Sequence, residues 1–207
     1  AGLEAPYLNV QPGVRMASCD NFTITVEGSS THGSTPHLGT DAIVAAASII
    51  MNIQTYVSRN NDPLNPLVVT VGKIDGGQRF NILANKVVME GTCRTFNPKV
   101  RQMVEHRLQE VLDGVCTLSG CTGELKYERG YCSVMNDPQQ ADYLLKTAAE
   151  LFGEDKAVRV EEPSMCAEDF AFYLTEKPGA FAWLGTALPD EEAWPLHNCH
   201  FTAPEDI

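Results

Sequence analysis

Residues 21–50 read NFTITVEGSSTHGSTPHLGTDAIVAAASII, and this stretch decides the fold of the larger part of the chain. Apolar side chains alternate with threonines over residues 22–26, which predicts a strand with one buried face. Residues 28–39 are dense in Gly, Ser, Thr and Pro and predict a loop. Thr40 or Asp41 then offers an N-cap, after which apolar residues recur at helical spacing to about residue 59.

The segments that follow extend this strand, loop and helix into a six-element pattern. We expect two more strands, a second amphipathic helix and a last strand, at residues 67–74, 86–96, 98–119 and 124–128. The order β-α-β-β-α-β is that of the ferredoxin-like fold, in which two helices cover one face of a four-stranded antiparallel sheet. The sequence therefore predicts an α+β chain with a ferredoxin-like βαββαβ domain over residues 19–130.

The two flanks of this domain follow a different pattern. After residue 130 we expect a helix, a short strand, a short helix and a buried strand, at residues 138–152, 158–160, 166–174 and 180–185. That is too little sheet to cover the apolar faces of the helices. Residues 131–207 are therefore predicted to be an incomplete α/β segment. Residues 1–18 show no periodicity and are predicted to be a connecting segment.

Charge and composition exclude several classes of partner. The 207 residues carry 15 Lys and Arg against 27 Asp and Glu, a net charge of −12, without the basic stripe that a nucleic acid requires. The longest apolar run, about ten residues, is too short for a bilayer span. No signal peptide is expected, because the N-terminus has neither a basic start nor an apolar stretch. Seven cysteines without a CxxC pair predict reduced thiols and a cytoplasmic location.

Four of the five histidines occur in two close pairs. His32 and His37 lie in the predicted loop, and His197 and His200 lie in the sequence WPLHNCHF. Irregular backbone can aim a loop histidine at a site, although the simpler interpretation of each is a solvent-facing or hydrogen-bonded imidazole. No complete zinc motif is present, so His197 could supply one metal ligand but could not hold a metal alone.

Two further groups of polar residues could carry chemistry. Glu168 and Asp169 are expected at the start of a short helix, where they could orient a ligand histidine, contact substrate, or only match the positive end of the helix dipole. Asn81 lies in a predicted loop and Arg94 near the end of the next strand, and an extended hairpin could bring the two to one end of the sheet. Such a pair suits recognition of a carboxylate and a neighbouring carbonyl. Otherwise the Arg is a surface residue and the Asn caps the backbone.

Four segments in succession resemble the aminoacylase/carboxypeptidase family of dinuclear metallopeptidases. The resemblance is to its amidohydrolase branch, which includes hippurate hydrolase, indole-acetyl-amino-acid hydrolase and N-acyl-amino-acid amidohydrolase. The segments are GSSTHGSTPH (28–37), GKIDGGQRFNILANKVVMEGTCRTF (72–96), PSMCAEDFAFYL (163–174) and WPLHNCHF (194–201). The resemblance spans residues 10–207.

The resemblance implies a fold and a reaction. Members carry a ferredoxin-like lid, which also dimerises, inserted into a catalytic domain with two divalent metals, usually zinc and sometimes manganese or cobalt. They hydrolyse the amide bond of N-acyl amino acids or small peptides. By this resemblance the chain supplies the lid at residues 19–130 and the C-terminal part of the catalytic domain at residues 131–207, and forms a homodimer through the lid.

The resemblance also implies roles for single residues. His32 matches the lid histidine that reaches the partner subunit's active site and stabilises the tetrahedral intermediate. Asn81 and Arg94 match the residues that hold the substrate's carbonyl or carboxylate end. His197 matches the last metal ligand. The acidic pair near the site matches Glu168 and Asp169.

The family's other metal ligands and its general-base glutamate lie N-terminal to the lid, and none of those motifs is in this chain. The metal site is therefore expected to be incomplete and the chain inactive by itself. The alternative is a non-catalytic ferredoxin-like module used for dimerisation or small-ligand binding, with structural histidines. Burial of His32 in the core of the domain would favour that alternative.

Overall fold

The computed structural model describes residues 5, 7–159, 162–188 and 192–203. The chain divides into two compact units. We call Ala17–Ser133 together with Met165–Ala167 the sheet unit, and the remaining residues, 1–16, 134–164 and 168–207, the flanking unit. Each unit is built on its own sheets.

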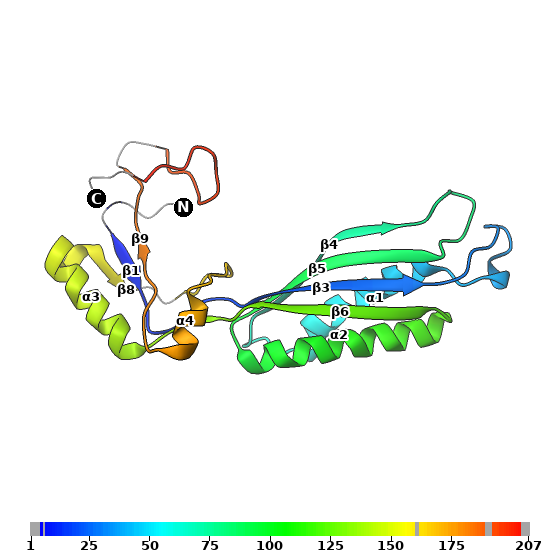
Figure 1. Cartoon of the computed structure of the whole chain (residues 1–207), viewed down its shortest axis with the longest axis horizontal. Coiled ribbons are helices and arrows are strands. Elements are labelled where there is room, and N and C mark those ends of the chain that lie inside the picture. The colour runs from blue at the N-terminus through cyan, green and yellow to red at the C-terminus, as the bar shows by residue number, and fades with distance from the viewer. Residues whose placement is uncertain (1–4, 6, 160–161, 189–191, 204–207) are drawn as a thin grey trace. The chain divides into compact units, whose positions relative to one another are not determined.

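Four antiparallel strands form the sheet of the sheet unit, in the order β4-β5-β3-β6. They are β3 (Cys19–Glu27), β4 (Leu67–Gly76), β5 (Lys86–Thr95) and β6 (Thr122–Tyr131). Helices α1 (Ala42–Thr55) and α2 (Pro98–Ser119) run along this sheet (Figure 1), and α1 continues into a π-helical turn, Tyr56–Asn60. The predicted βαββαβ order is confirmed.

A core between the sheet and the two helices holds this unit together. Phe22, Ile24 and Val26 of β3 are at most 2% exposed and alternate with more exposed residues. Leu108 and Leu112, one turn apart on α2, are fully buried. Burying a side chain of this size contributes roughly 1.5–3 kcal/mol to stability. The two periodicities, of two and of 3.6 residues, therefore meet in one apolar layer.

Both helices begin at capping residues that the sequence marks. The carboxylate of Asp41 accepts hydrogen bonds from two backbone N–H groups in the first turn of α1, at 2.9 and 3.3 Å. Asn97 caps α2 in the same way, through the N–H of Lys99 at 2.9 Å. Asp41, and not Thr40, is thus the N-cap of α1. Because Asp41 directly follows the loop that carries His32, this cap fixes one end of that loop.

The flanking unit has shorter elements. Three strands form one sheet in the order β8-β1-β9, and two others form the pair β2-β7. The strands are β1 (Leu8–Val10), β2 (Gly13–Met16), β7 (Val134–Asn136), β8 (Ala157–Arg159) and β9 (Trp183–Leu184), and the helices are α3 (Pro138–Phe152) and α4 (Ala171–Glu176), with a 3-10 turn at Glu154–Lys156. β1 pairs in parallel with β8 and antiparallel with β9.

Several predictions for the flanks need correction. The sequence predicts no strand in residues 1–18, but β1 and β2 lie there, because strands of three and four residues are too short to show a period. The helix predicted over residues 166–174 begins only at Ala171. The strand predicted at 180–185 is reduced to the two residues of β9. The strand predicted at 158–160 is found as β8, and residue 160 lies outside the described residues.

The late start of α4 has a visible cause in the backbone. The N–H of Ser164 donates to the carbonyl of Arg15, and the carbonyl of Cys166 accepts from Ala17, each at 3.0 Å. A backbone engaged in extended pairing cannot also make helical hydrogen bonds. Residues 164–166 therefore stay extended although their composition is compatible with a helix.

Buried polar atoms without a partner gather in the flanking unit. Within the described residues there are four side-chain atoms of this kind, Asn9 Oδ1, Gln11 Oε1, Arg15 Nε and Trp183 Nε1. Burial lowers the pKa of Arg15, whose guanidinium lies 5.1 Å from the centre of the Trp183 ring. The main cluster of buried apolar residues, by contrast, lies wholly in the sheet unit. Buried polar groups normally have partners, so the described residues leave the interior of the flanking unit incompletely satisfied.

Two further observations concern membrane-spanning helices and disulfide bonds. No helix in the described part of the chain is long and apolar enough to cross a membrane. The seven cysteines all lie at described positions, and none of them forms a disulfide.

Candidate functional site

The loop that carries His32 is closed at its base by backbone pairing. Ser29 and Thr40 exchange backbone hydrogen bonds at 3.0 and 3.1 Å, and their hydroxyl oxygens lie 3.2 Å apart. Gly28 permits this closure, because a Cβ there would lie 2.3 Å from the carbonyl oxygen of Thr40. The loop therefore leaves and re-enters the fold at one point, beside the end of β3. A 3-10 turn, Pro36–Leu38, lies within it.

His32 lies on a continuation of the pairing between β3 and β5. Beyond the strand ends, His32 and Ile82 form an isolated antiparallel bridge, and the N–H of Gly33 donates to the carbonyl of Asn81 at 2.8 Å. His32 and Asn81 are thus brought to the same end of the sheet by backbone contacts. Both residues are exposed, as the amidohydrolase interpretation of His32 requires and the structural-histidine alternative does not.

The His32 ring is held through its Nδ1 atom. The backbone N–H of Ser34 donates to Nδ1 at 3.2 Å, and the Ser34 hydroxyl oxygen lies 2.6 Å from the same nitrogen. The carbonyl of His32 accepts from the amide of Thr35 at 2.8 Å and from its hydroxyl at 3.2 Å. No described residue hydrogen-bonds to Nε2. This nitrogen is the part of the ring without a hydrogen-bond partner among the described residues.

Arg94 lies at the opposite end of the same sheet. It is the ninth residue of β5 and pairs with Val68, at the start of β4, whereas Asn81 lies beyond the end of β4 and before the start of β5. At about 3.3 Å per residue, the length of β5 places Arg94 on the order of 25 Å from the His32 end. The prediction that the hairpin brings Asn81 and Arg94 to one end of the sheet is therefore wrong.

One nitrogen of the Arg94 guanidinium already has a hydrogen-bond partner. Its Nη1 donates to the backbone carbonyl of Met165 at 3.1 Å, and its side chain is half-buried. This contact ties the end of β5 to the segment Met165–Ala167, which belongs to the same unit. The other N–H groups of the guanidinium form a planar fork that can bind a carboxylate.

His197 occupies an uncommon backbone conformation. It is exposed, and its φ is +69°. Among the described non-glycine residues, only His197 has a positive φ. It stands third in a turn closed by the N–H of Asn198 donating to the carbonyl of Pro195, at 3.1 Å. Histidine tolerates this conformation better than most side chains, and such residues recur at functional sites. The side chain is therefore presented outward from a tight turn.

Glu168 and Asp169 lie before α4 and not in it. Their backbone carbonyls accept from the N–H groups of Ala171 and Phe172, at 3.3 and 2.9 Å. The helix begins after Phe170, and no side chain caps it. The prediction that the two acids open the helix is thus wrong by two residues, because the carbonyls and not the carboxylates serve the first turn.

The described residues do not complete a metal site. They contain no group of three or more His, Cys, Asp or Glu side chains placed to hold one ion. One histidine cannot hold a metal by itself, so the role of His197 as a single ligand stays a prediction.

A buried ion pair that sequence reasoning missed lies in the sheet unit. The Asp20 carboxylate, 1% exposed, accepts from Nε and Nη2 of Arg101, from the Tyr127 hydroxyl at 3.0 Å and from the N–H of Gly130 at 3.0 Å. The hydrogen bond to Asp20 raises the pKa of Arg101, and burial raises the pKa of Tyr127. Nearby, burial raises the pKa of the Cys93 thiol to about 12. The hydrogen bonds of the Asp20 carboxylate thus join β3, β6 and α2.

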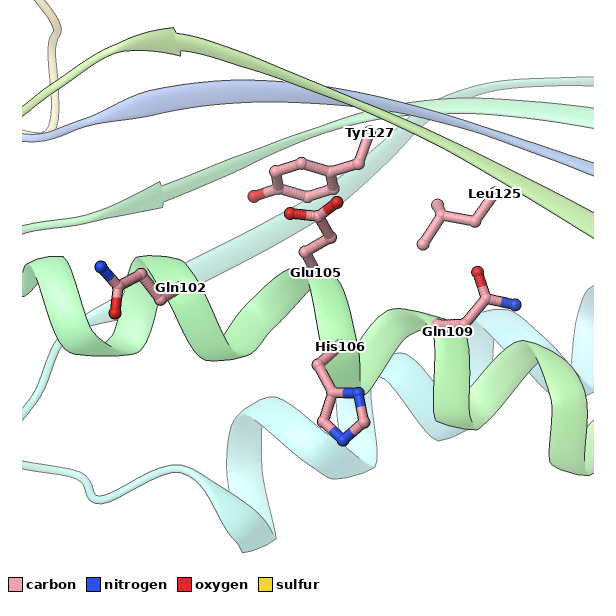
Figure 2. A pocket seen from close by; sticks show the side chains of 6 residues that line it. All are labelled: Gln102, Glu105, His106, Gln109, Leu125 and Tyr127. Carbon is pink, nitrogen blue, oxygen red and sulfur yellow. The ribbon is translucent and has the colours of Figure 1, made fainter.

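One hollow in the sheet unit contains none of the predicted site residues. It has a volume of about 340 Å³ and lies between α2 and β6, lined by Gln102, Glu105, His106, Gln109, Leu125 and Tyr127. In Figure 2 the Glu105 side chain rises from α2 toward Tyr127, whereas the His106 ring is directed away from the strand. Glu105 also pairs with Arg129 at 2.7 Å. His106 and Gln109 are likewise paired on the helix surface, with Glu110 and Asp113.

The comparisons with known proteins agree with this arrangement. Residues 19–116 match the peptidase dimerisation domain. The N-acetyl-L-cysteine deacetylase of Bacillus subtilis is 36% identical to this chain over 200 residues, which are 96% of this chain and 46% of that protein. The chain spans about half the length of the curated relatives it matches.

Two solved structures are similar over nearly the whole chain. A protein of methicillin-resistant Staphylococcus aureus, described as an aminohydrolase, has a TM-score of 0.89 at 31% identity, covering 99% of this chain and 52% of that one. The Bacillus subtilis YXEP protein, described as a dinuclear metal binding peptidase of the M20 family, has a TM-score of 0.77 at 30% identity, covering 99% and 49%. The family resemblance seen in the sequence is confirmed, and this chain belongs to the M20 family of peptidases and amidohydrolases, with the peptidase dimerisation domain at residues 19–116.

Proposed function

We propose that this chain is the lid and part of the catalytic domain of a dinuclear-metal amidohydrolase that cleaves the amide bond of N-acyl amino acids or small peptides. The observation that carries the proposal is the exposed His32. It stands at the end of the sheet, held by backbone pairing, and offers a free ring nitrogen. An outward histidine on a fixed loop suits a role on a neighbouring molecule, whereas a structural histidine would be packed in the core.

The described residues do not supply all the ligands that the metal chemistry requires. In a two-metal hydrolase the ions polarise the scissile carbonyl and supply hydroxide at neutral pH. His197 is our candidate for one ligand, with Glu168 and Asp169 as groups that support the site. The ions are zinc, or alternatively manganese or cobalt. The remaining ligands and the proton-transferring glutamate would come from the part of the relatives' length that this chain does not span.

The residues of the chain itself have roles that follow from their chemistry. His32 donates a hydrogen bond from Nε2 to the oxygen that becomes negative as the carbonyl is attacked. Arg94 binds the carboxylate of the amino-acid end through its planar fork. Asn81, beside His32, binds the carbonyl through its amide N–H groups.

The distance between these residues supports a site built from two subunits. His32 and Asn81 lie at one end of the sheet and Arg94 at the other, on the order of 25 Å away. One substrate the size of an N-acyl amino acid cannot touch both ends of one lid. We therefore propose that each catalytic centre of a homodimer takes His32 and Asn81 from one lid and Arg94 from the other.

The orphaned polar atoms of the flanking unit support the same proposal. Asn9 Oδ1, Arg15 Nε and Trp183 Nε1 are buried without partners in the described residues. Leaving such atoms unpaired costs roughly 1–3 kcal/mol each, so further polypeptide is expected to bind there. In this proposal it is the rest of the catalytic domain.

The decisive experiment is an activity assay with added zinc or manganese. The 207-residue chain is expected to be inactive on N-acetyl and N-benzoyl amino acids, and the full-length enzyme is expected to release the free amino acid. Hydrolysis by the 207-residue chain would show that its site is complete. The failure of the metal-loaded full-length dimer on every acyl amino acid and dipeptide would instead favour a non-catalytic dimerisation module.

A further inference from the structure

We propose that Ser34 is a positioning residue, which holds the neutral ring of His32 in the tautomer that carries its proton on Nε2. The catalytic meaning of this inference rests on the proposed function. The tautomer itself does not, and it is measured separately below.

The backbone N–H of Ser34 favours one state of Nδ1. It donates to Nδ1 at 3.2 Å. A backbone N–H can only donate, so this hydrogen bond forms only with the Nδ1 lone pair and favours the tautomer without a proton on Nδ1. In a neutral imidazole the proton then lies on the other nitrogen, Nε2, because the hydrogen bond made by one ring nitrogen sets the state of the second.

The hydroxyl of Ser34 adds a second donor at the same atom. Its oxygen lies 2.6 Å from Nδ1, a short distance for a hydrogen bond. Because the amide already favours Nδ1 as an acceptor, the hydroxyl takes the donor role and strengthens that preference. Two donors from one residue therefore favour one tautomer of the His32 ring.

The backbone around the ring keeps these two donors in place. The amide of Thr35 closes a tight turn on the carbonyl of His32 at 2.8 Å, and the Thr35 hydroxyl bonds to the same carbonyl at 3.2 Å. On the other side, the bridge to Ile82 fixes the His32 backbone against the neighbouring strand. An exposed histidine would ordinarily sample several rotamers, and this turn removes much of that freedom.

The consequence for catalysis is the polarity of the free ring nitrogen. With the proton on Nε2, the outward edge of the ring is a hydrogen-bond donor and attracts a developing oxyanion. With the proton on Nδ1, the same edge would present a lone pair and repel it. Ser34 therefore prepares the donor before the substrate arrives, so that the ring needs no reorganisation during the reaction.

The direct test is NMR spectroscopy of the imidazole nitrogens in the 207-residue chain. Long-range proton–nitrogen spectra show which ring nitrogen carries the proton, and His32→Ala assigns the signals. We expect the Nε2-protonated pattern for His32 in the wild type. Ser34→Ala keeps the amide donor and loses the hydroxyl, so the Nε2-protonated fraction should fall, and Ser34→Thr should restore it. Ser30→Ala, at an exposed serine of the same loop, is the matched control and should leave the pattern unchanged.

A kinetic test in the full-length enzyme separates this inference from the proposed function. Ser34→Ala should lower kcat about fivefold with little change in KM, the size expected for one ordinary hydrogen bond, and Ser34→Thr should recover most of it. An unchanged imidazole pattern in Ser34→Ala overturns the inference, whatever the activity. A changed pattern with unchanged kcat overturns the catalytic role of the tautomer, and an enzyme inactive as wild type overturns the proposed function alone.

Discussion

Arg101 donates to the buried carboxylate of Asp20 through both Nε and Nη2, although 81 residues separate the two in the chain. The carboxylate is 1% exposed and also accepts from Tyr127 and from the backbone of Gly130. One charged group thus joins β3, β6 and α2. A buried pair of this kind is costly to break, because the remaining charge stays in an apolar environment.

We therefore predict that Asp20→Ala lowers the free energy of unfolding of the sheet unit by about 3–5 kcal/mol, as for other broken buried pairs. The measurement is the urea midpoint followed by circular dichroism. Glu90→Ala, which breaks the exposed pair with Lys73, is the matched control and should leave the midpoint nearly unchanged. Equal effects of the two variants would show that the Asp20 network adds nothing beyond a surface pair.

This network also shows where sequence reasoning stops. The alternation of Phe22, Ile24 and Val26 predicted β3, and the spacing of apolar residues predicted both helices, because these patterns are local. The partner of Asp20 depends on how α2 packs across the strand ends, and no spacing in the sequence reports that. The order of elements was therefore predictable, but the ion pair was not.

The candidate site, too, could be predicted from the sequence only in part. His32 and Asn81 stand out as polar residues in loops, and the register of β3 with β5 brings them together. For Arg94 the prediction failed, because the extended strand β5 separates the two residues: Asn81 lies before its start and Arg94 is near its end. Ser34 was missed although it lies only two residues after His32. Its role depends on side-chain direction, which the sequence does not give.

We predict that the sheet unit loses stability as the pH rises above about 9. Burial raises the pKa of Cys93 from an ordinary value of 9.0 to about 12, so the folded state holds this proton more tightly than the unfolded state does. The stabilisation is complete below the unfolded pKa and is lost as pH rises through the folded value. The raised pKa of Tyr127 acts in the same direction.

Urea midpoints at several pH values between 8 and 11 measure this effect. Cys93→Ala should flatten the decline because it removes one of the groups whose pKa burial raises, whereas Cys199→Ala, at an exposed cysteine, should not. A decline of the same slope in wild type and Cys93→Ala would show that the thiol is not its source.

His32→Ala should damage turnover without damaging the fold. The side chain is exposed, so we expect an unchanged thermal midpoint. Removal of an oxyanion donor lowers kcat by about 10²–10³-fold in other enzymes, and we expect a loss of this size in the full-length protein. His37→Ala changes an exposed histidine of the same loop and is the control. A large loss of stability with little loss of turnover would identify His32 as a structural residue.

Arg94→Lys should weaken the binding of the substrate's carboxylate. Lysine keeps the charge but loses the planar fork, so we expect KM to rise about tenfold for an N-acyl amino acid, the equivalent of one lost charge-assisted hydrogen bond. The diagnostic measurement compares that substrate with its uncharged amide. The discrimination between the two should shrink in Arg94→Lys and persist in Arg59→Ala, which changes an exposed arginine elsewhere in the sheet unit. An unchanged ratio would place carboxylate recognition at another residue.

Mixed dimers test whether His32 acts on the partner subunit. Suppose that one full-length subunit carries His32→Ala and the other His197→Ala. If each centre combines His197 of one chain with His32 of the other, the mixed dimer contains one intact centre and one centre with both defects. If both residues act within one chain, every centre has a defect.

Unfolding and refolding the two inactive variants together should therefore restore about a quarter of the wild-type activity, since half of the dimers are mixed and each has one working centre. The two variants refolded separately and then mixed without exchange are the control and should stay inactive. No recovery in a sample shown by mass spectrometry to contain mixed dimers would mean that His32 serves its own chain. The separation of His32 from Arg94 along β5 would then need another explanation.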